Sequence, residues 1–129
     1  MKSTKDQYNV LLKALLPSDL FDYFDIIQVI VNETTIDVHL DELNILPEGY
    51  ESEKLISKGF HPVVVIQDFP IRERAMFLHV RRRKWQVVSS GHIISREWDI
   101  TTKGTRYTKG FAAFLKELFG QIPGEQQKS

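Results

Sequence analysis

The residues best suited to bind a ligand are five in a row: Arg81, Arg82, Arg83, Lys84 and Trp85. Arginine forms paired hydrogen bonds with phosphate groups and with guanine edges, and an adjacent tryptophan can stack on a base or anchor its strand. Six further cations close by in the sequence could extend this surface: Arg72, Arg74, Arg96, Lys103, Arg106 and Lys109. Lys109 falls in the first turn of a predicted helix, where backbone N–H groups also favour a phosphate. The pattern indicates a nucleic-acid-binding surface; the alternative is a solvated strand face.

The charges are unevenly distributed, although the formal net charge is zero. Residues 1–69 hold 5 Lys and 12 acidic residues, a balance of −7, whereas residues 70–110 hold 10 Lys or Arg and 3 acidic residues, a balance of +7. Residues 111–129 are neutral, with 2 of each sign. Such an asymmetry favours a polyanion as partner. The alternative is that the acidic and basic segments pair with each other in the fold.

Few features of the sequence support a metal site or a catalytic site. The four histidines, at positions 39, 61, 79 and 92, have no ligand spacing, and there is no cysteine. Five aspartates could in principle hold a metal ion for phosphoryl transfer, but their spacing does not favour it: Asp25, Asp37, Asp41, Asp68 and Asp99. Ser89-Ser90-Gly91 lies between two predicted strands and is no nucleophile elbow, and no Gly-rich phosphate loop is present. We therefore expect a protein that is not an enzyme and has no catalytic residues, metal or cofactor.

Length and composition indicate one globular domain. The chain has 129 residues, of which 42% are hydrophobic and 26% charged. The lack of cysteine excludes disulfides and fits a reducing cytoplasm. No signal peptide precedes the domain, and the longest apolar runs, such as Val63–Ile66, are too short to cross a bilayer. We expect a cytoplasmic protein without membrane contact.

Helices are predicted at both ends of the domain. Thr4–Gln7 reads as a capping box, and apolar residues from Tyr8 to Leu16 follow at helical spacing until Pro17. Ser18 can begin a second short helix through Phe24, with Leu20, Phe21 and Phe24 on its buried side. Thr108 can cap a last helix that ends at Gly120 and has an apolar stripe of four residues: Phe111, Phe114, Leu115 and Leu118.

Strands are predicted between these helices. Ile26–Val31 and Thr35–Leu40 form a hairpin, followed by an acidic connection, 41–58, that is mobile or partly helical near Ser52–Ser57. Strand patterns resume at Phe60–Asp68, then Phe69–Glu73 forms a turn. Arg74–Trp85 reads as one long strand in which Met76, Leu78 and Val80 share a face. Since Arg82 and Lys84 would fall on that apolar face, we expect the strand to leave the core near Arg82 through a bulge or twist. After a turn, His92–Trp98 returns as a shorter strand.

These patterns predict an α+β fold. Residues 1–24 are helical, residues 25–99 form an antiparallel sheet of about five to six strands, and residues 107–119 form a helix. Residues 1–120 make up a single domain, and residues 121–129 form a polar tail.

Two segments resemble a known family. Ile66–Ile71 and Phe77–Trp85, followed by Arg106-Tyr107-Thr108-Lys109, resemble the N-terminal region of insertion-sequence transposases of the ISL-three and ISAon-one type. In that family an Asp-aromatic/Leu-Pro-Ile turn precedes an apolar strand with an Arg-rich, aromatic end, and then a zinc knuckle. The resemblance covers about residues 60–118. Val87 and Ser90 stand where the two knuckle cysteines would lie, so it implies zinc-ribbon-like hairpins without zinc, held by packing and strand pairing.

The resemblance also implies a function. The chain lacks the helix-turn-helix and the Asp-Asp-Glu catalytic domain that follow in the family, which a second reading frame encodes in split elements. It would then be a non-catalytic DNA-binding or targeting subunit, with insertion-sequence ends and a separate catalytic chain as partners, and a homodimer is possible. The alternative is a protein-interaction module that assembles the transposase without binding DNA, using Trp85 and Trp98 as exposed aromatics. A small metal-dependent nuclease that uses the aspartates is a third hypothesis.

Overall fold

Seven strands and two helices make up the described part of the chain, which confirms the predicted α+β class. The structure is a computed structural model, and it describes residues 4–17, 20, 22–98, 101 and 105–123. The elements are, in order, α1 (Thr4–Leu15), β1 (Phe24–Val31), β2 (Thr35–Glu42), β3 (Leu55–Phe60), β4 (Val64–Ile71), β5 (Arg74–Arg81), β6 (Arg83–Val87), β7 (Ile93–Ile94) and α2 (Lys109–Phe119).

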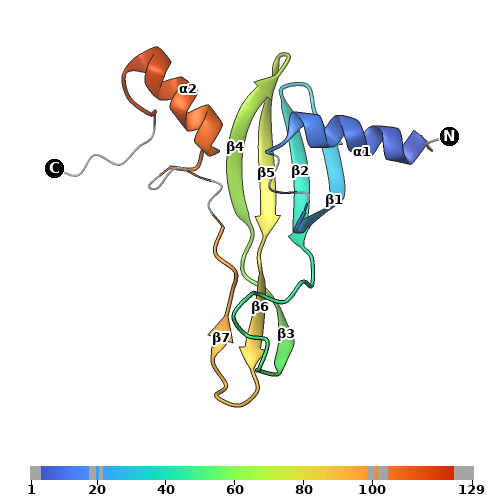
Figure 1. Ribbon diagram of the computed structural model, residues 1–129. Helices are drawn as coiled ribbons and strands as arrows, with labels where there is room; N and C mark the ends of the chain where they lie inside the picture. The colour runs from blue at the N-terminus through green and yellow to red at the C-terminus, as the bar shows by residue number, and fades with distance from the viewer. Residues whose placement is uncertain (1–3, 18–19, 21, 99–100, 102–104, 124–129) are drawn as a thin grey trace.

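The strands form two sheets that lie end to end (Figure 1). The larger sheet has the order β1-β2-β5-β4 and the smaller one the order β3-β6-β7, and β5 leads directly into β6. The predicted antiparallel pairing holds for every pair except β2 and β5, which are parallel. The parallel pair arises because the chain leaves β2 for the smaller sheet and comes back through the β4–β5 hairpin, which places β5 beside β2 in the same direction.

The core lies on one face of the larger sheet. Met76, Leu78 and Val80 are buried there, as their alternation predicts, against Val38, Leu40 and Ile66 of the neighbouring strands. Leu16, Leu20 and Phe24 cover this face from the N-terminal segment. Leu20 and Phe24 are thus buried as expected, but Phe24 begins β1 and does not end a helix. Ser18 and Phe21 of that predicted helix lie outside the described residues.

The predicted strand Arg74–Trp85 is two strands with a break at Arg82. Before the break the even positions 76, 78 and 80 are buried, and after it the odd positions 85 and 87 are buried. The expected departure from regular alternation near Arg82 is therefore confirmed. An unbroken strand would have buried Arg82 and Lys84, whereas the break buries Trp85 and Val87 in the smaller sheet.

Three further segments differ from their predictions. Residues 55–57, expected to be mobile or partly helical, belong to β3, where they pair with β6. The predicted strand His92–Trp98 is limited to β7, because Arg96 and Trp98 turn toward Glu42. The predicted turn Phe69–Glu73 is shorter, since β4 continues to Ile71.

Helix α2 has the predicted caps. The Thr108 hydroxyl accepts a hydrogen bond from the Phe111 N–H, and Gly120 ends the helix in the left-handed conformation that glycine adopts most easily. Phe111 and Leu115 are buried, while Phe114 and Leu118 of the predicted apolar stripe are exposed. Among the described residues, neither helix has the length and apolar character needed to span a membrane.

Candidate nucleic-acid interface

The basic stretch lies where the two sheets meet, but its side chains have different surroundings. Arg81 is the last residue of β5 and lies beside the end of β2. Its Nε donates to Asp41 Oδ1 at 2.6 Å, and its Nη2 donates to Asp41 Oδ2. This bidentate pair raises the pKa of Arg81 above its ordinary value. Arg81 is therefore neutralised by the acidic half of the chain.

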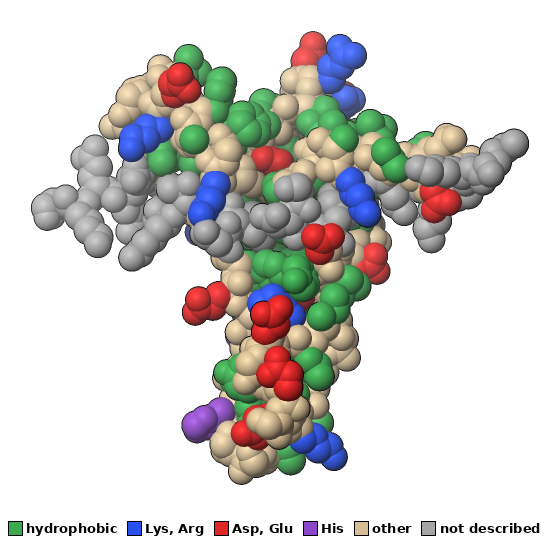
Figure 2. Space-filling model, in the orientation of Figure 1, with side chains coloured by type: hydrophobic (Ala, Val, Ile, Leu, Met, Phe, Trp, Pro, Cys, Tyr) green, Lys and Arg blue, Asp and Glu red, His purple; other side chains and the backbone are tan. Residues whose placement is uncertain are grey.

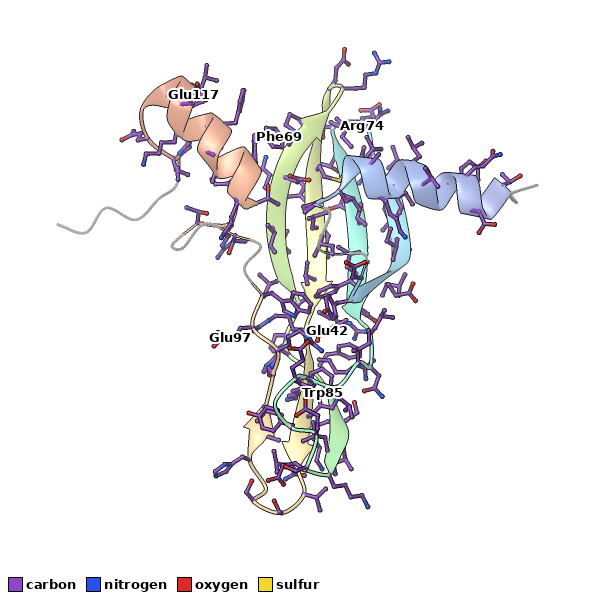
Figure 3. The ribbon with its side chains drawn as sticks, in the orientation of Figure 1. Glu42, Phe69, Arg74, Trp85, Glu97 and Glu117 are labelled. Atoms are coloured by element: carbon purple, nitrogen blue, oxygen red, sulfur yellow. The ribbon has the colours of Figure 1, made fainter. Side chains whose placement is uncertain are left out.

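Arg83 and Trp85 are also engaged within the protein. The Arg83 guanidinium donates to the Glu42 carbonyl at 3.2 Å and to Ser57 Oγ at 3.0 Å. Trp85 is fully buried, and its indole N–H donates to Asn44 Oδ1 at 3.1 Å (Figure 3). The expectation of an exposed Trp85 is therefore wrong, because the change of alternation at Arg82 turns this side chain into the core of the smaller sheet.

Glu42 organises the junction, although sequence reasoning did not single it out. Its side chain is 1% exposed. Its Oε1 accepts from the Arg83 backbone N–H at 3.0 Å and from the Trp98 indole N–H at 3.1 Å. Its Oε2 lies 3.8 Å from Arg96 Nε, and Arg96 Nη2 donates to the carbonyls of residues 45 and 46. Trp98 is thus half-buried and anchored, and Arg96 is held inside the junction.

Arg82 and Lys84 have different surroundings from Arg81, Arg83 and Arg96. Within the described part of the chain, neither side chain forms an ion pair or a hydrogen bond, whereas Arg83, which also has no carboxylate ion pair, is held by hydrogen bonds. Arg82 and Lys84 act instead on His61, which follows β3 and donates its backbone N–H to the Arg82 carbonyl. Desolvation first, and then the positive charges of Arg82 and Lys84, lower the pKa of His61. The His61 ring also lies 2.5 Å from the Ser95 hydroxyl.

Arg82 also lines a pocket of about 200 Å³. Its walls are mostly apolar and include Val64, Ile66, Val80 and Trp98, with Arg82 as the charged residue among the described lining residues. Among the described residues, Arg82 thus brings a positive charge and hydrogen-bond donors to the edge of a mostly apolar pocket, and Lys84 adds a second positive charge that acts on the neighbouring His61. The two cations suit an anion, because they offer positive charge and hydrogen-bond donors.

The other predicted cations do not join this group. Arg72 and Arg74 lie at the turn between β4 and β5, at the far end of the larger sheet (Figure 3). Eight residues of β5 separate that turn from the junction, a distance of about 25 Å. Arg74 Nε donates to the Asn32 carbonyl at 2.7 Å. Arg106 and Lys109 lie beside the middle of β4 at the start of α2, and Lys103 falls outside the described residues.

Acidic side chains gather on one face of the smaller sheet (Figure 2). The loop of residues 43–54 crosses the side of β6 that carries Trp85, and its Glu48, Glu51 and Glu53 are exposed. Lys84 precedes Trp85 in an extended strand, so its side chain lies on the opposite face. A polyanion would therefore meet β6 on the face away from this acidic loop.

The structure also brings His39 and His79 together on the parallel strands β2 and β5. Their rings stack with centroids 4.3 Å apart, and His79 Nε2 lies 2.7 Å from Asp37 Oδ1. Of the other aspartates, Asp41 pairs with Arg81 and Asp68 accepts from the Thr108 hydroxyl, while Asp99 is outside the described residues. Across the described ranges, no three His, Asp or Glu side chains are arranged to hold a metal ion.

Sequence reasoning thus found the basic stretch but missed Glu42, His61 and Ser95. Glu42 had one usable feature: it is acidic at an even position of β2, where Val38 and Leu40 are core residues. Comparison of the chain with known protein families, with curated proteins and with solved structures found no match.

Proposed function

We propose that this chain is a non-catalytic nucleic-acid-binding module that contacts phosphates with Arg82 and Lys84. One observation carries the proposal: among the described residues, the side chains of these two cations form neither an ion pair nor a hydrogen bond, whereas Arg81, Arg83 and Arg96 all do. Arg81, Arg83 and Arg96 instead form hydrogen bonds that hold the junction of the two sheets together. The contact surface is thus narrower than the whole basic stretch and faces away from the acidic loop.

A matched pair of double variants tests this division of roles. Arg82→Ala/Lys84→Ala and Arg81→Ala/Arg83→Ala each remove two positive charges from the same stretch. Fluorescence anisotropy with labelled duplex and single-stranded DNA, measured over a range of salt concentrations, gives the affinity and its salt dependence. We expect the first variant to lower the slope of log K against log salt by about 2, because each lost phosphate contact contributes about 0.9.

The second double variant is the control for loss of charge alone. It should keep the salt slope of the wild type, provided that circular dichroism shows an intact fold. Absence of binding by the wild type at low salt would refute the proposal, as would equal losses in the two double variants.

The transposase part of the proposal is supported by the sequence resemblance alone. Under this resemblance, the ligand is the DNA of insertion-sequence ends and the partner is a separate catalytic chain. The protein is then located in the cytoplasm. The reading frame that follows this one must then encode an Asp-Asp-Glu recombinase. If that frame encodes a different kind of protein, the assignment to a transposase is refuted, whereas the proposal of nucleic-acid binding is unaffected.

Exposed apolar residues on α2 favour a second candidate function, assembly with another protein. Phe114, Leu118 and Phe119 are between 47% and 62% exposed, while Phe111 and Leu115 hold the helix on the sheet. Apolar groups gathered on one helix face are typical of an interface. Co-purification with the catalytic chain that survives nuclease treatment, and is lost in Phe114→Ser/Leu118→Ser, would favour this candidate.

A further inference from the structure

The two edge strands of the larger sheet, β4 and β1, differ in how far the rest of the described chain covers them. At β4, the Gln67 N–H donates to the Arg106 carbonyl at 2.7 Å, and the Thr108 N–H donates to the Gln67 carbonyl at 2.9 Å. Helix α2 then packs on the same strand through Phe69, which contacts Phe111 and Phe114. Residues 105–119 thus cover the β4 edge. Strand β1 forms the opposite edge of the sheet and pairs only with β2 in the described structure.

The β1 edge has few of the features that usually protect an edge strand. Its sequence, FDIIQVIV, contains no lysine, arginine or proline, and its one charged residue is Asp25 near its start. A bulge at Ile27 interrupts the pairing with β2, after which Gln28–Val31 continue in regular register. Val29 and Val31 lie opposite Val38 and Ile36, so they belong to the face of the sheet that carries the core. They are nevertheless 42% and 60% exposed.

Helix α1 has an exposed apolar face in the same region. It crosses in front of β2 and β1, and its N-terminal part extends past the β1 edge (Figure 1). Tyr8, Leu11 and Leu15 share one helix face and are between 44% and 63% exposed. Among the side chains of α1 that the structure describes, Leu12 alone is half-buried. An isolated helix of 12 residues has marginal stability in water, so we expect this apolar face to pack against another surface.

We propose that β1 and α1 form a dimer interface with a second copy of this chain. In the dimer, β1 pairs antiparallel with β1 of the second copy, so the two larger sheets become one continuous sheet. The α1 helix of each copy then lies over the β1 strand of the other. A single contact with two-fold symmetry therefore covers both the β1 edge and the exposed apolar face of α1. For this reason we propose a second copy of the chain as the partner.

Charge and area agree with this arrangement. With Gln28 at the two-fold axis, Asp25 lies three residues from the axis, so it does not face Asp25 of the second copy. The exposed parts of Tyr8, Leu11, Leu15, Val29 and Val31 amount to roughly 500 Å² for each copy, against about 800 Å² per partner in a standard interface. Backbone pairing along β1 contributes further buried area.

The association state in solution tests the proposal. Size-exclusion chromatography with light scattering, over a series of chain concentrations, should show a reversible dimer for the wild type. Val29→Lys places an unpaired charge in the interface and Leu11→Asp places one under the helix, and each should weaken association at least about tenfold. Val88→Lys is the matched control, since Val88 is 49% exposed and lies beyond the end of β6. It should remain a dimer.

Cross-linking provides a second and independent readout, because the chain has no cysteine of its own. Gln28→Cys places a thiol at the proposed axis, where directly opposed Cβ atoms lie about 4.5–5.5 Å apart and can form a disulfide. We expect rapid disulfide-linked dimers under mild oxidation, and none above background for Ser90→Cys in the β6–β7 turn. A monomeric wild type at high concentration, dimers that persist in Val29→Lys, or equal cross-linking of the two cysteine variants would each overturn the proposal.

Discussion

Replacement of Glu42 by alanine tests the central structural claim, that one buried carboxylate joins the two sheets. The change removes the acceptor of two hydrogen bonds, from the Arg83 N–H and the Trp98 indole N–H, and the carboxylate nearest to Arg96 Nε. Glu42 ends β2 in the larger sheet, whereas Arg83 begins β6 in the smaller one. The substitution therefore acts on the connection between them.

The expected loss of stability is about 3 kcal/mol, because removal of one partner from a buried ion pair costs about 3–5 kcal/mol. The lower end of that range applies here for two reasons. The Glu42 Oε2 to Arg96 Nε distance is long, at 3.8 Å, and Arg96 keeps its hydrogen bonds to the carbonyls of residues 45 and 46. For a chain of this length the loss corresponds to a fall in Tm of roughly 10 °C.

Urea denaturation followed by tryptophan fluorescence measures this loss, since both tryptophans lie at or near the junction. Glu42→Gln retains an acceptor for the two N–H groups but removes the charge, so its loss should be intermediate. Glu97→Ala removes an exposed carboxylate nearby and serves as the control (Figure 3). A change of less than about 1 kcal/mol for Glu42→Ala, or one equal to that of Glu97→Ala, would refute the role assigned to Glu42.

Three further predictions concern other parts of the fold. Thr108→Ala should cost about 2 kcal/mol, because it removes the N-cap of α2 and the 2.7 Å hydrogen bond to buried Asp68; hydrogen exchange should speed up in α2 first, and uniform exchange would contradict this. Trp85→Ala should cost about 3–5 kcal/mol in thermal denaturation, since a fully buried side chain leaves a cavity; a loss below about 1 kcal/mol would mean that the smaller sheet does not depend on it. The pKa of His61 is lowered in the folded protein, so the unfolded chain binds a proton at this histidine more readily. The stability that neutral His61 contributes is therefore present above about pH 6.5 and is lost as the pH falls through the pKa of the folded state. His61→Gln should flatten that part of the dependence of the urea midpoint on pH, and an unchanged profile would count against the effect.

The elements that the sequence predicted best depend on contacts between close neighbours in the chain. Helix α2 is fixed by the Thr108 cap, its apolar spacing and the Gly120 stop, all within 13 residues. The β1–β2 hairpin depends on two apolar strands and a short turn at residues 32–34. The break at Arg82 was also predictable, because burial of both Arg82 and Lys84 would have cost too much.

The elements that were missed depend on distant partners. Strand β3 is short, follows a polar, acidic segment, and is fixed by its pairing with β6, nearly thirty residues later. The parallel pairing of β2 with β5 likewise depends on the path of residues 43–73 through the smaller sheet and back. No local pattern contains either fact.

The sequence by itself determined where the positive charge of this protein lies, because arginine remains charged in almost any surrounding. It could not determine which of these charges are available to a ligand. The Arg81 side chain pairs with the Asp41 carboxylate, 40 residues earlier in the sequence, and the Arg83 guanidinium donates to the backbone carbonyl of Glu42, 41 residues earlier. Only the tertiary structure, by placing the end of β2 beside the β5–β6 break, divided the basic stretch into Arg81 and Arg83, which are held by hydrogen bonds, and Arg82 and Lys84, whose side chains form neither an ion pair nor a hydrogen bond in the described part of the chain.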